Sequence, residues 1–392
     1  MLNTSLRLTA SFSLITTLIL SSCSLAFADS IVVPDPPQLA AKAWVLVDFD
    51  SGRVLAEHNA NEQVEPASLT KIMTGYIVFR ELAANRLKMD ELATISKNAW
   101  QQPGSRSFVN VGAQLPIDTL VHGMIIQSGN DSSVALAEKV AGSVEVFSQL
   151  MNEHAQKLGM KGTHFVNPTG LPDPAHYTTA NDMVKVASAV IRNFPEYYKI
   201  YSQKEFVWNN IKQPNRNRLL WQDESVDGMK TGHTESAGYC LVASAKRGDM
   251  RLITVILGTD SEKARAQETQ KLLNYGFRFY ETHKLYQANQ ELQKIHVWQG
   301  EKDDLAIGIA DATYLTIPRS QYDNLKPVIE FQSEMIAPVS KGQTIGTLKV
   351  TLADKELAKI PLIALEDVAQ GGFFKRAIDQ AKLAIERMSS NK

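Results

Sequence analysis

The chain is 392 residues long, with 44% hydrophobic and 21% charged residues and a formal net charge of −1. This balance excludes a disordered chain and a polytopic membrane protein, and the near-zero charge argues against nucleic acid or another polyanion as the main partner. A chain of this length is expected to form two or three folded units, at least one with a sizeable core.

Residues 1–28 have the features of a secretory signal peptide. Arg7 precedes an apolar stretch, and an Ala-Phe-Ala string at 26–28 supplies the small residues of a cleavage site. Cleavage there is preferred over an alternative in which Cys23 would be lipidated as in a lipoprotein. The exported protein would then keep Cys240 alone, inside an apolar run, so we expect a buried thiol and no internal disulfide.

The region after the signal peptide alternates between strand and helix patterns. A hairpin is predicted where residues 44–48 and 54–57 flank the turn at 50–52, and a second strand pair at 239–245 and 252–257. Apolar residues recur at helical spacing in 72–77, 120–126, 134–140, 147–158, 183–191 and 264–275. Thr179 and Asp182 form a capping box before one of these helices. Strands at both ends with helices between them predict an α/β sandwich.

Beyond about residue 284 the pattern changes. Short runs such as 347–352, where apolar and polar residues alternate, predict a small all-β domain. From Gly371 onward the sequence predicts a basic amphipathic helix. The apolar face of that helix comprises Phe374, Ala377, Ile378, Ala381, Ile385 and Met388.

Three short motifs follow one another along the chain. They are Ser-Leu-Thr-Lys at 68–71, Ser-Gly-Asn at 128–130 and Lys-Thr-Gly at 230–232. The strings at 389–392 and 96–98 match the first two patterns by chance, so neither pattern is decisive alone. Each of the three motifs nevertheless falls where acyl-transfer chemistry needs it: at a helix start, in an interhelical loop and on the strand that leads a hairpin.

The first motif predicts an activated nucleophile. Ser68 follows Pro66 and Ala67 at the start of a helix, and Lys71 lies three residues on, on the same face. A serine hydroxyl needs a neighbour that takes its proton, and a lysine does so once its pKa falls. The positive end of the helix and a second cation, Lys230, both disfavour protonation of Lys71.

The other two motifs supply the remaining steps of an acyl transfer. Ser128 would relay a proton toward the leaving group, and Asn130 would hold a substrate amide. The backbone N–H groups of Ser68 and His233 would stabilise an oxyanion. A free carboxylate on the substrate suits hydroxyls and arginines. The substrate-binding residues expected around the third motif are Thr231, Gly232, His233 and Thr234.

Simpler roles exist for each residue taken singly. Ser68 suits a helix cap, Asn130 a left-handed loop position, His233 a protein surface and Lys230 a strand edge. Their joint occurrence favours the catalytic interpretation. The sequence has no Gly-x-Ser-x-Gly elbow, no His-Glu-x-x-His helix and no phosphate-binding glycine loop, and its eight histidines are scattered. Neither a cofactor nor a metal site is predicted.

The motif trio and its flanking strings resemble the low-molecular-mass penicillin-binding proteins of Gram-negative bacteria, which are serine D-Ala-D-Ala carboxypeptidases. The resemblance spans about residue 40 to the C-terminus and includes Pro-Ala-Ser-Leu-Thr-Lys, Gln-Ser-Gly-Asn-Asp and Asp-Gly-Met-Lys-Thr-Gly-His-Thr. It implies a β-lactamase/transpeptidase-like α/β domain over 29–283, with an antiparallel sheet between helices. A small β-rich domain at 284–368 and a membrane-anchoring helix at 369–392 would follow.

The resemblance also implies the site and the partners. Arg216, in an Asn-Arg-Asn string, and Arg265, at the start of a late helix, would lie near the substrate carboxylate. The substrate would be a peptidoglycan stem pentapeptide, and β-lactam antibiotics would acylate Ser68. The protein would be periplasmic and peripheral on the inner membrane. The tail departs from the family pattern in its alanines and its lack of Trp, which predicts weaker attachment.

Three alternatives stay open at the level of sequence. A β-lactamase needs a base for rapid deacylation, commonly a glutamate, but residues 160–172 contain no acid. A transpeptidase or endopeptidase would share the acylation step. A non-catalytic wall-binding scaffold would need neither Ser68 nor the two lysines.

Overall fold

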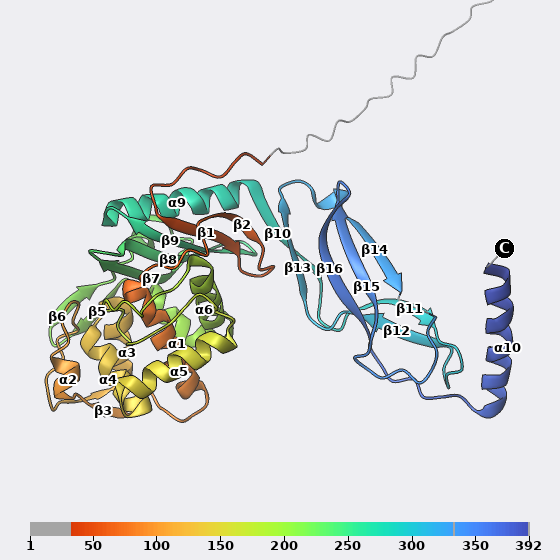
Figure 1. Cartoon of the computed structure of the whole chain (residues 1–392), viewed down its shortest axis with the longest axis horizontal. Helices are drawn as coiled ribbons and strands as arrows, with labels where there is room; N and C mark the ends of the chain where they lie inside the picture. Colours follow the sequence, from red (N-terminus) through yellow and green to blue (C-terminus); the bar gives the residue numbers. More distant parts are fainter. Residues whose placement is uncertain (1–32, 332–333, 391–392) are drawn as a thin grey trace, which may run out of the picture.

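The computed structural model describes residues 33–331 and 334–390, so the predicted signal peptide lies outside the described residues. Figure 1 shows a larger α/β domain, an elongated β domain beside it and a terminal helix at the far end of the molecule. The α/β architecture followed by an all-β domain and a helix confirms the predicted fold class.

An antiparallel five-stranded sheet forms the centre of the α/β domain. In spatial order its strands are β2 (Val54–His58), β1 (Ala43–Asp48), β9 (Met250–Thr259), β8 (Gly238–Arg247) and β7 (Val226–Thr234). The predicted hairpin is β1–β2, and the second strand pair is β8–β9.

The residues of β1 explain why helices cover both faces of this sheet. Val45 belongs to the buried cluster shared with the helical core, while Trp44 and Leu46 pack into the cluster that includes Leu272 and Leu273 of α9 (Glu262–Phe279). Successive strand residues point to opposite faces, so an unbroken apolar strand requires cover on both sides. Cys240 is fully buried in β8, as expected.

The helical layer lies between β2 and β7 in the sequence. Its longer helices are α1 (Lys71–Ala83), α3 (Ile117–Ile126), α4 (Asn130–Ala141), α5 (Val144–Lys157) and α6 (Ala180–Asn193). Thr179 Oγ1 accepts a hydrogen bond from the Asp182 N–H at 3.1 Å, as the capping pattern predicts. Shorter elements complete the layer: η1 (Ala67–Thr70), β3 (Leu92–Thr94), α2 (Lys97–Trp100), β4 (Gln114–Pro116), α7 (Pro195–Tyr198), η2 (Lys199–Ser202), β5 (Glu205–Trp208), β6 (Ile211–Pro214) and α8 (Leu219–Gln222).

The C-terminal part of the described chain is built from strands and one helix. β10 (Tyr280–Tyr286) pairs with β13 (Thr313–Pro318), and Leu348 and Val350 are buried in the β-domain core, as their alternation predicts. A five-stranded sheet has the order β11 (Glu291–His296), β12 (Asp304–Gly308), β16 (Lys355–Ala364), β15 (Thr344–Leu352) and β14 (Lys326–Phe331), and η3 (Tyr322–Asn324) and α10 (Phe373–Ser390) complete it.

Hydrogen bonds of partly or fully buried hydroxyl groups join the two domains. Ser51 Oγ lies 2.6 Å from Thr316 Oγ1, and Thr282 Oγ1 donates to Asp48 Oδ2 at 2.6 Å. Asp48 and Thr316 are fully buried. The turn of the first hairpin is therefore hydrogen-bonded to the strand pair that opens the β domain.

Candidate active site

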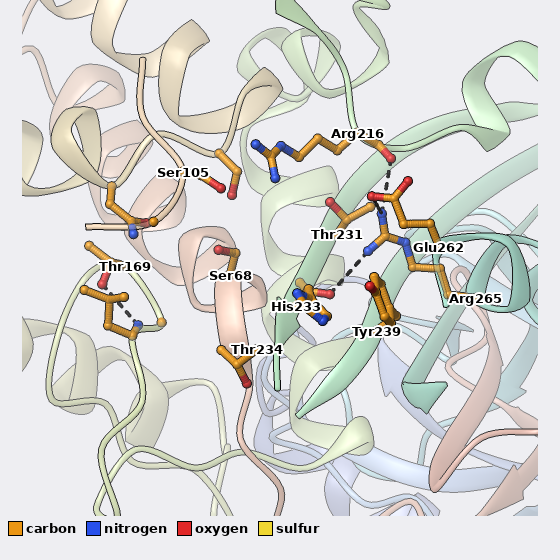
Figure 2. A pocket seen from close by; sticks show the side chains of 16 residues that line it. Ser68, Ser105, Thr169, Arg216, Thr231, His233, Thr234, Tyr239, Glu262 and Arg265 are labelled. Carbon is orange, nitrogen blue, oxygen red and sulfur yellow. Dashed lines mark hydrogen bonds and ion pairs between the residues drawn. The ribbon is translucent and has the colours of Figure 1, made fainter. Parts of the chain in front are cut away.

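The backbone around Ser68 is held in an uncommon conformation. Ser68 lies in η1, the short 3-10 turn that leads into α1, and the preceding Ala67 has a φ of +48°. A Cβ at Gly170 would lie 1.8 Å from the Ala67 carbonyl oxygen, so only glycine permits this close approach. Non-glycine residues with positive φ are uncommon and often occur at functional sites. The turn places Ser68 in the wall of a cleft in the α/β domain (Figure 2).

Lys71 is almost completely buried and hydrogen-bonds to residues that line this cleft. Its side chain is 1% exposed, and Nζ donates to Ser68 Oγ at 2.9 Å, Asn130 Oδ1 at 2.7 Å and the Thr169 carbonyl at 2.6 Å. Burial, together with the positive charge of Arg216, lowers the pKa of Lys71 to about 7. A substantial fraction of the lysine is therefore a neutral amine at neutral pH, within hydrogen-bond reach of the serine hydroxyl.

The second and third motifs meet on the other side of the cleft. Ser128 joins α3 to α4, has a φ of +67° and is 2% exposed. Lys230 Nζ donates to Ser128 Oγ at 2.9 Å and to the Thr231 carbonyl at 3.0 Å. Burial, followed by the charges of Lys71 and two arginines, lowers the pKa of Lys230 well below its usual value. The interhelical loop and the edge strand β7 thus bring a second serine–lysine pair into the same cleft.

Asn130 belongs to the second motif but contacts the lysine of the first. It is the first residue of α4, and its Oδ1 accepts from Lys71 while its Nδ2 donates to the Pro103 carbonyl at 2.6 Å. These two contacts define which end of the amide carries oxygen. The sequence analysis gave a left-handed loop conformation as the simpler role of Asn130. In the structure Ser128 has that conformation and Asn130 does not.

The cleft has a volume of about 400 Å³, and its rim carries two arginines and one glutamate, Glu262 (Figure 2). Arg216 and Arg265 both line it, but Arg265 is only 4% exposed and donates to the carbonyls of Gly232 at 3.4 Å and Arg216 at 3.5 Å. Arg265 therefore supports the rim, and Arg216 is the more exposed guanidinium. An electropositive cleft of this kind suits a substrate that carries a carboxylate.

The residues after Lys230 form the β7 side of the cleft. Thr231, Gly232, His233 and Thr234 all line it, and the His233 ring stacks on Tyr239 with ring centroids 4.0 Å apart. Thr234 Oγ1 accepts from the Ala237 N–H at 3.0 Å and donates to Glu65 at 3.2 Å. Every site residue predicted from the sequence therefore either lines the cleft or donates a hydrogen bond to a residue that lines it.

Sequence reasoning missed the parts of the site that lie outside the motifs. The Thr169 carbonyl, which accepts from Lys71, lies in the segment 160–172, whose lack of an acid was the feature used above. Its Asn-Pro-Thr-Gly string is typical of an ordered turn and was the available signal. The other cleft-lining residues that were missed are Gly104, Ser105, Gly170, Leu171, Tyr239 and Glu262.

Comparison with known proteins identifies this arrangement. Residues 30–261 match the D-alanyl-D-alanine carboxypeptidase family, and residues 280–370 match the C-terminal domain of penicillin-binding protein 5. The chain is 46% identical to the D-alanyl-D-alanine carboxypeptidase DacC of Escherichia coli over 88% of each chain, and 41% identical to DacA of the same species over 97% of each.

Solved structures agree. Penicillin-binding protein 5 from Haemophilus influenzae superimposes with a TM-score of 0.84 at 41% identity, covering 86% of this chain and 100% of that one. Penicillin-binding protein D2 from Listeria monocytogenes, solved in an ampicillin-bound form, has a TM-score of 0.57 at 29% identity over 62% of this chain and 100% of that one.

Fold and cleft together define a penicillin-binding protein of low molecular mass. The chain belongs to the D-alanyl-D-alanine carboxypeptidase family, and it is a serine D-Ala-D-Ala carboxypeptidase.

Proposed function

We propose that Ser68 attacks the carbonyl between the two terminal D-alanines of a peptidoglycan stem pentapeptide, with neutral Lys71 as the base. The observation that carries this is the 2.9 Å contact between Lys71 Nζ and Ser68 Oγ, combined with the lowered pKa of the buried lysine. The terminal D-Ala leaves with its nitrogen protonated, and water then hydrolyses the acyl-enzyme.

The second serine–lysine pair suits delivery of that proton. Ser128 Oγ accepts from Lys230 at 2.9 Å, so its own hydroxyl hydrogen is free to point into the cleft toward the leaving nitrogen. Asn130 accepts a hydrogen bond from Lys71 and would hold the substrate amide. The N–H groups of Ser68 and His233 remain the proposed oxyanion donors.

The carboxylate of the terminal D-Ala would bind at the basic end of the cleft. Thr231 and Arg216 line that end, while Arg265 holds the Gly232 and Arg216 carbonyls in place. His233 and Thr234 complete the wall on which the peptide would lie. These contacts fit a free C-terminal carboxylate and explain why the cleft is electropositive.

Product analysis distinguishes the possible reactions of the acyl-enzyme. Purified protein is incubated with a defined stem pentapeptide and, separately, with a crosslinked muropeptide dimer. Release of D-Ala from the pentapeptide, with the dimer left intact, is expected for a carboxypeptidase. Cleavage of the dimer at a comparable rate would identify an endopeptidase, and a crosslinked product from pentapeptide would identify a transpeptidase.

A long-lived penicilloyl adduct is expected with fluorescent penicillin. The carboxylate that lines the cleft in the described part of the chain, Glu262, forms ion pairs with Arg218 at 3.1 Å and Arg265 at 3.7 Å, so it is poorly placed to activate a hydrolytic water. Labelled protein should persist on a gel after excess drug is removed. Rapid hydrolysis of penicillin without a detectable adduct would instead indicate a β-lactamase, and no labelling at all would favour the scaffold alternative.

We also propose that the protein is exported and attaches to the inner-membrane surface through α10. The helix contacts the β domain with its other face: Leu383 and Asp379 are 4% and 5% exposed, and Asp379 Oδ2 accepts from the Gln299 N–H at 2.9 Å. No described helix is long and apolar enough to cross a bilayer. The exposed large apolar side chains on α10 are Phe373, Phe374, Ile378, Ile385 and Met388.

Membrane attachment is expected to depend on this exposed apolar face. Deletion from Gly371 onward should release the protein from the membrane fraction, and a triple change of Phe374, Ile378 and Ile385 to serine should do the same, because each large apolar side chain contributes about 1.5–3 kcal/mol of burial. Arg387→Gln, which breaks an ion pair with Glu334 on the docked side, is the matched control. Unchanged membrane association of both altered proteins would contradict the proposal.

On this proposal residues 29–283 are the catalytic domain, 284–368 the small β domain and 369–392 the anchor. In Figure 1 the anchor helix lies at the end of the β domain farthest from the α/β domain. The β domain would therefore act as a spacer that holds the cleft away from the membrane surface.

A further inference from the structure

The segment 101–109, between α2 and β4, passes over the cleft without regular secondary structure. Gly104 and Ser105 line the cleft. Pro103 and Gly104 are exposed, whereas Ser107 and Val109 are buried. A loop of this kind has backbone groups that must find partners outside any helix or sheet. How its conformation is fixed therefore bears directly on the shape of the site.

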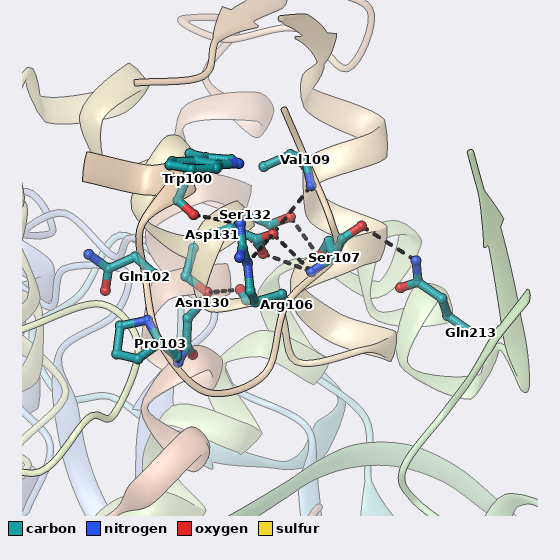
Figure 3. Close-up of polar contacts among 12 residues, drawn as sticks. Trp100, Gln102, Pro103, Arg106, Ser107, Val109, Asn130, Asp131, Ser132 and Gln213 are labelled. Carbon is teal, nitrogen blue, oxygen red and sulfur yellow. Dashed lines mark hydrogen bonds and ion pairs between the residues drawn. The ribbon is translucent and has the colours of Figure 1, made fainter. Parts of the chain in front are cut away.

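Asp131, the residue after Asn130, supplies the partners for the buried end of the loop. Its side chain is completely buried. Asp131 Oδ1 accepts from the Ser107 N–H at 2.8 Å, and Oδ2 accepts from the Ser107 N–H at 3.0 Å and the Val109 N–H at 3.3 Å (Figure 3). Arg106 Nε is 3.9 Å away, beyond hydrogen-bond distance. A buried carboxylate is costly unless hydrogen bonds compensate it, and here the loop backbone provides them.

The other end of the loop holds Asn130. The Asn130 N–H donates to the Ser105 carbonyl at 2.7 Å, and its Nδ2 donates to the Pro103 carbonyl at 2.6 Å. Because the amide nitrogen is committed to Pro103, the amide oxygen must face Lys71, from which it accepts at 2.7 Å. The exposed tip of the loop thus determines the orientation of a side chain in the centre of the site (Figure 3).

We propose that Asp131 is a positioning residue for acylation: it fixes the loop 101–109, and the loop carbonyls orient the Asn130 amide against Lys71. This rests on the proposed function, in which Lys71 and Asn130 act on the substrate. The simpler alternative is that Asp131 only stabilises the fold, as a buried acid in the first turn of α4 that also accepts from the Ser132 N–H at 2.9 Å.

The two roles are separated by measuring chemistry and binding independently. Stopped-flow acylation with a fluorescent penicillin gives the rate constant of acylation and the dissociation constant of the noncovalent complex. For Asp131→Asn we expect the acylation rate constant to fall about tenfold or more, because small displacements of reacting groups are costly, while the dissociation constant changes by less than about threefold. Thermal unfolding should remain cooperative.

The negative charge of Asp131 also raises the pKa of Lys71 and so opposes the lowering by burial. Acylation is therefore compared at about pH 9, where Lys71 is neutral in both proteins and the lost charge no longer contributes.

A second pair of variants decides the question if Asp131→Asn does not fold. Gly104 has a φ of +81°, and a Cβ there would lie 3.0 Å from Asn130 Nδ2, whereas Gly112 has a φ of +76° and nothing within 4 Å. Gly104→Ala and Gly112→Ala strain the backbone equally, but only the first pushes on the amide. We expect slower acylation, by about tenfold, in Gly104→Ala alone.

Three results would overturn the proposal. The first is an acylation rate constant within about twofold of wild type in a folded Asp131→Asn. The second is a decrease in acylation that is fully accounted for by a smaller fraction of folded protein. The third is equal behaviour of Gly104→Ala and Gly112→Ala. Failure of the wild-type protein to be acylated would instead refute the proposed function, so the two outcomes are distinguishable.

Discussion

Ser68→Ala is expected to abolish both D-Ala release and labelling by fluorescent penicillin. The substitution removes the hydroxyl oxygen that acts as the nucleophile, which lies 2.9 Å from Lys71 Nζ. The other side chains of the cleft stay the same. Loss of a catalytic nucleophile lowers turnover by about 10⁴-fold or more. Mass spectrometry should show no penicilloyl adduct, and the thermal unfolding midpoint should stay close to that of the wild type because Ser68 is only partly buried.

Ser389→Ala is the matched control for this experiment. Ser389 begins the second Ser-x-x-Lys string of the chain, and α10 lies at the far end of the molecule from the α/β domain in Figure 1. D-Ala release and penicillin labelling should be unchanged in this variant. Persistent D-Ala release by Ser68→Ala would show that another residue is the nucleophile.

Lys71→Arg is expected to reduce the acylation rate by about 10³-fold, because it replaces a lysine that is able to lose its proton with a permanently charged guanidinium. A guanidinium does not lose its proton in proteins, so arginine at this position is unable to act as a base. Lys139→Arg is the control, because Lys139 forms a surface ion pair with Glu91 at 2.7 Å outside the cleft. Full acylation of Lys71→Arg would mean that the serine proton goes elsewhere, with Lys230 as the next candidate.

The pH dependence of the wild type provides the companion measurement. Below a pKa of about 7 the folded enzyme holds Lys71 protonated, and it has no base for Ser68. The value of kcat/KM should therefore rise about tenfold per pH unit up to near pH 7 and then level off. A profile that is flat between pH 5 and about pH 8 would contradict a lysine base.

Local features of the fold followed directly from the sequence. The β1–β2 hairpin, the longer helices and the alternation at Leu348 and Val350 were predicted because side-chain periodicity reports which face of an element is buried. The helix α10 was also predicted from the sequence, since Phe374, Ile378 and Ile385 recur at helical spacing. The sequence did not predict that α10 packs on the β domain with its other face, because that contact depends on the β-domain surface at Gln299.

Within the site, the sequence determined which side chains are available and that Lys71 lies one helical turn from Ser68. That pair is local, so its spacing alone brings the two side chains together. The remaining contacts join segments that are far apart in the chain. Lys230 meets Ser128 across 102 residues, Thr169 meets Lys71 across 98, and Asn130 meets Pro103 across 27.

These long-range contacts were decided by the tertiary structure alone. A hydrogen bond requires its two heavy atoms to lie about 3 Å apart, and motif spacing does not specify such a distance between separate segments. The packing of β7 and the helical layer sets those distances, and it also sets the burial that lowers the pKa of Lys71. The sequence therefore determined the chemical class of the protein, and the folded packing decided that Lys71 is positioned and neutral enough to act as a base.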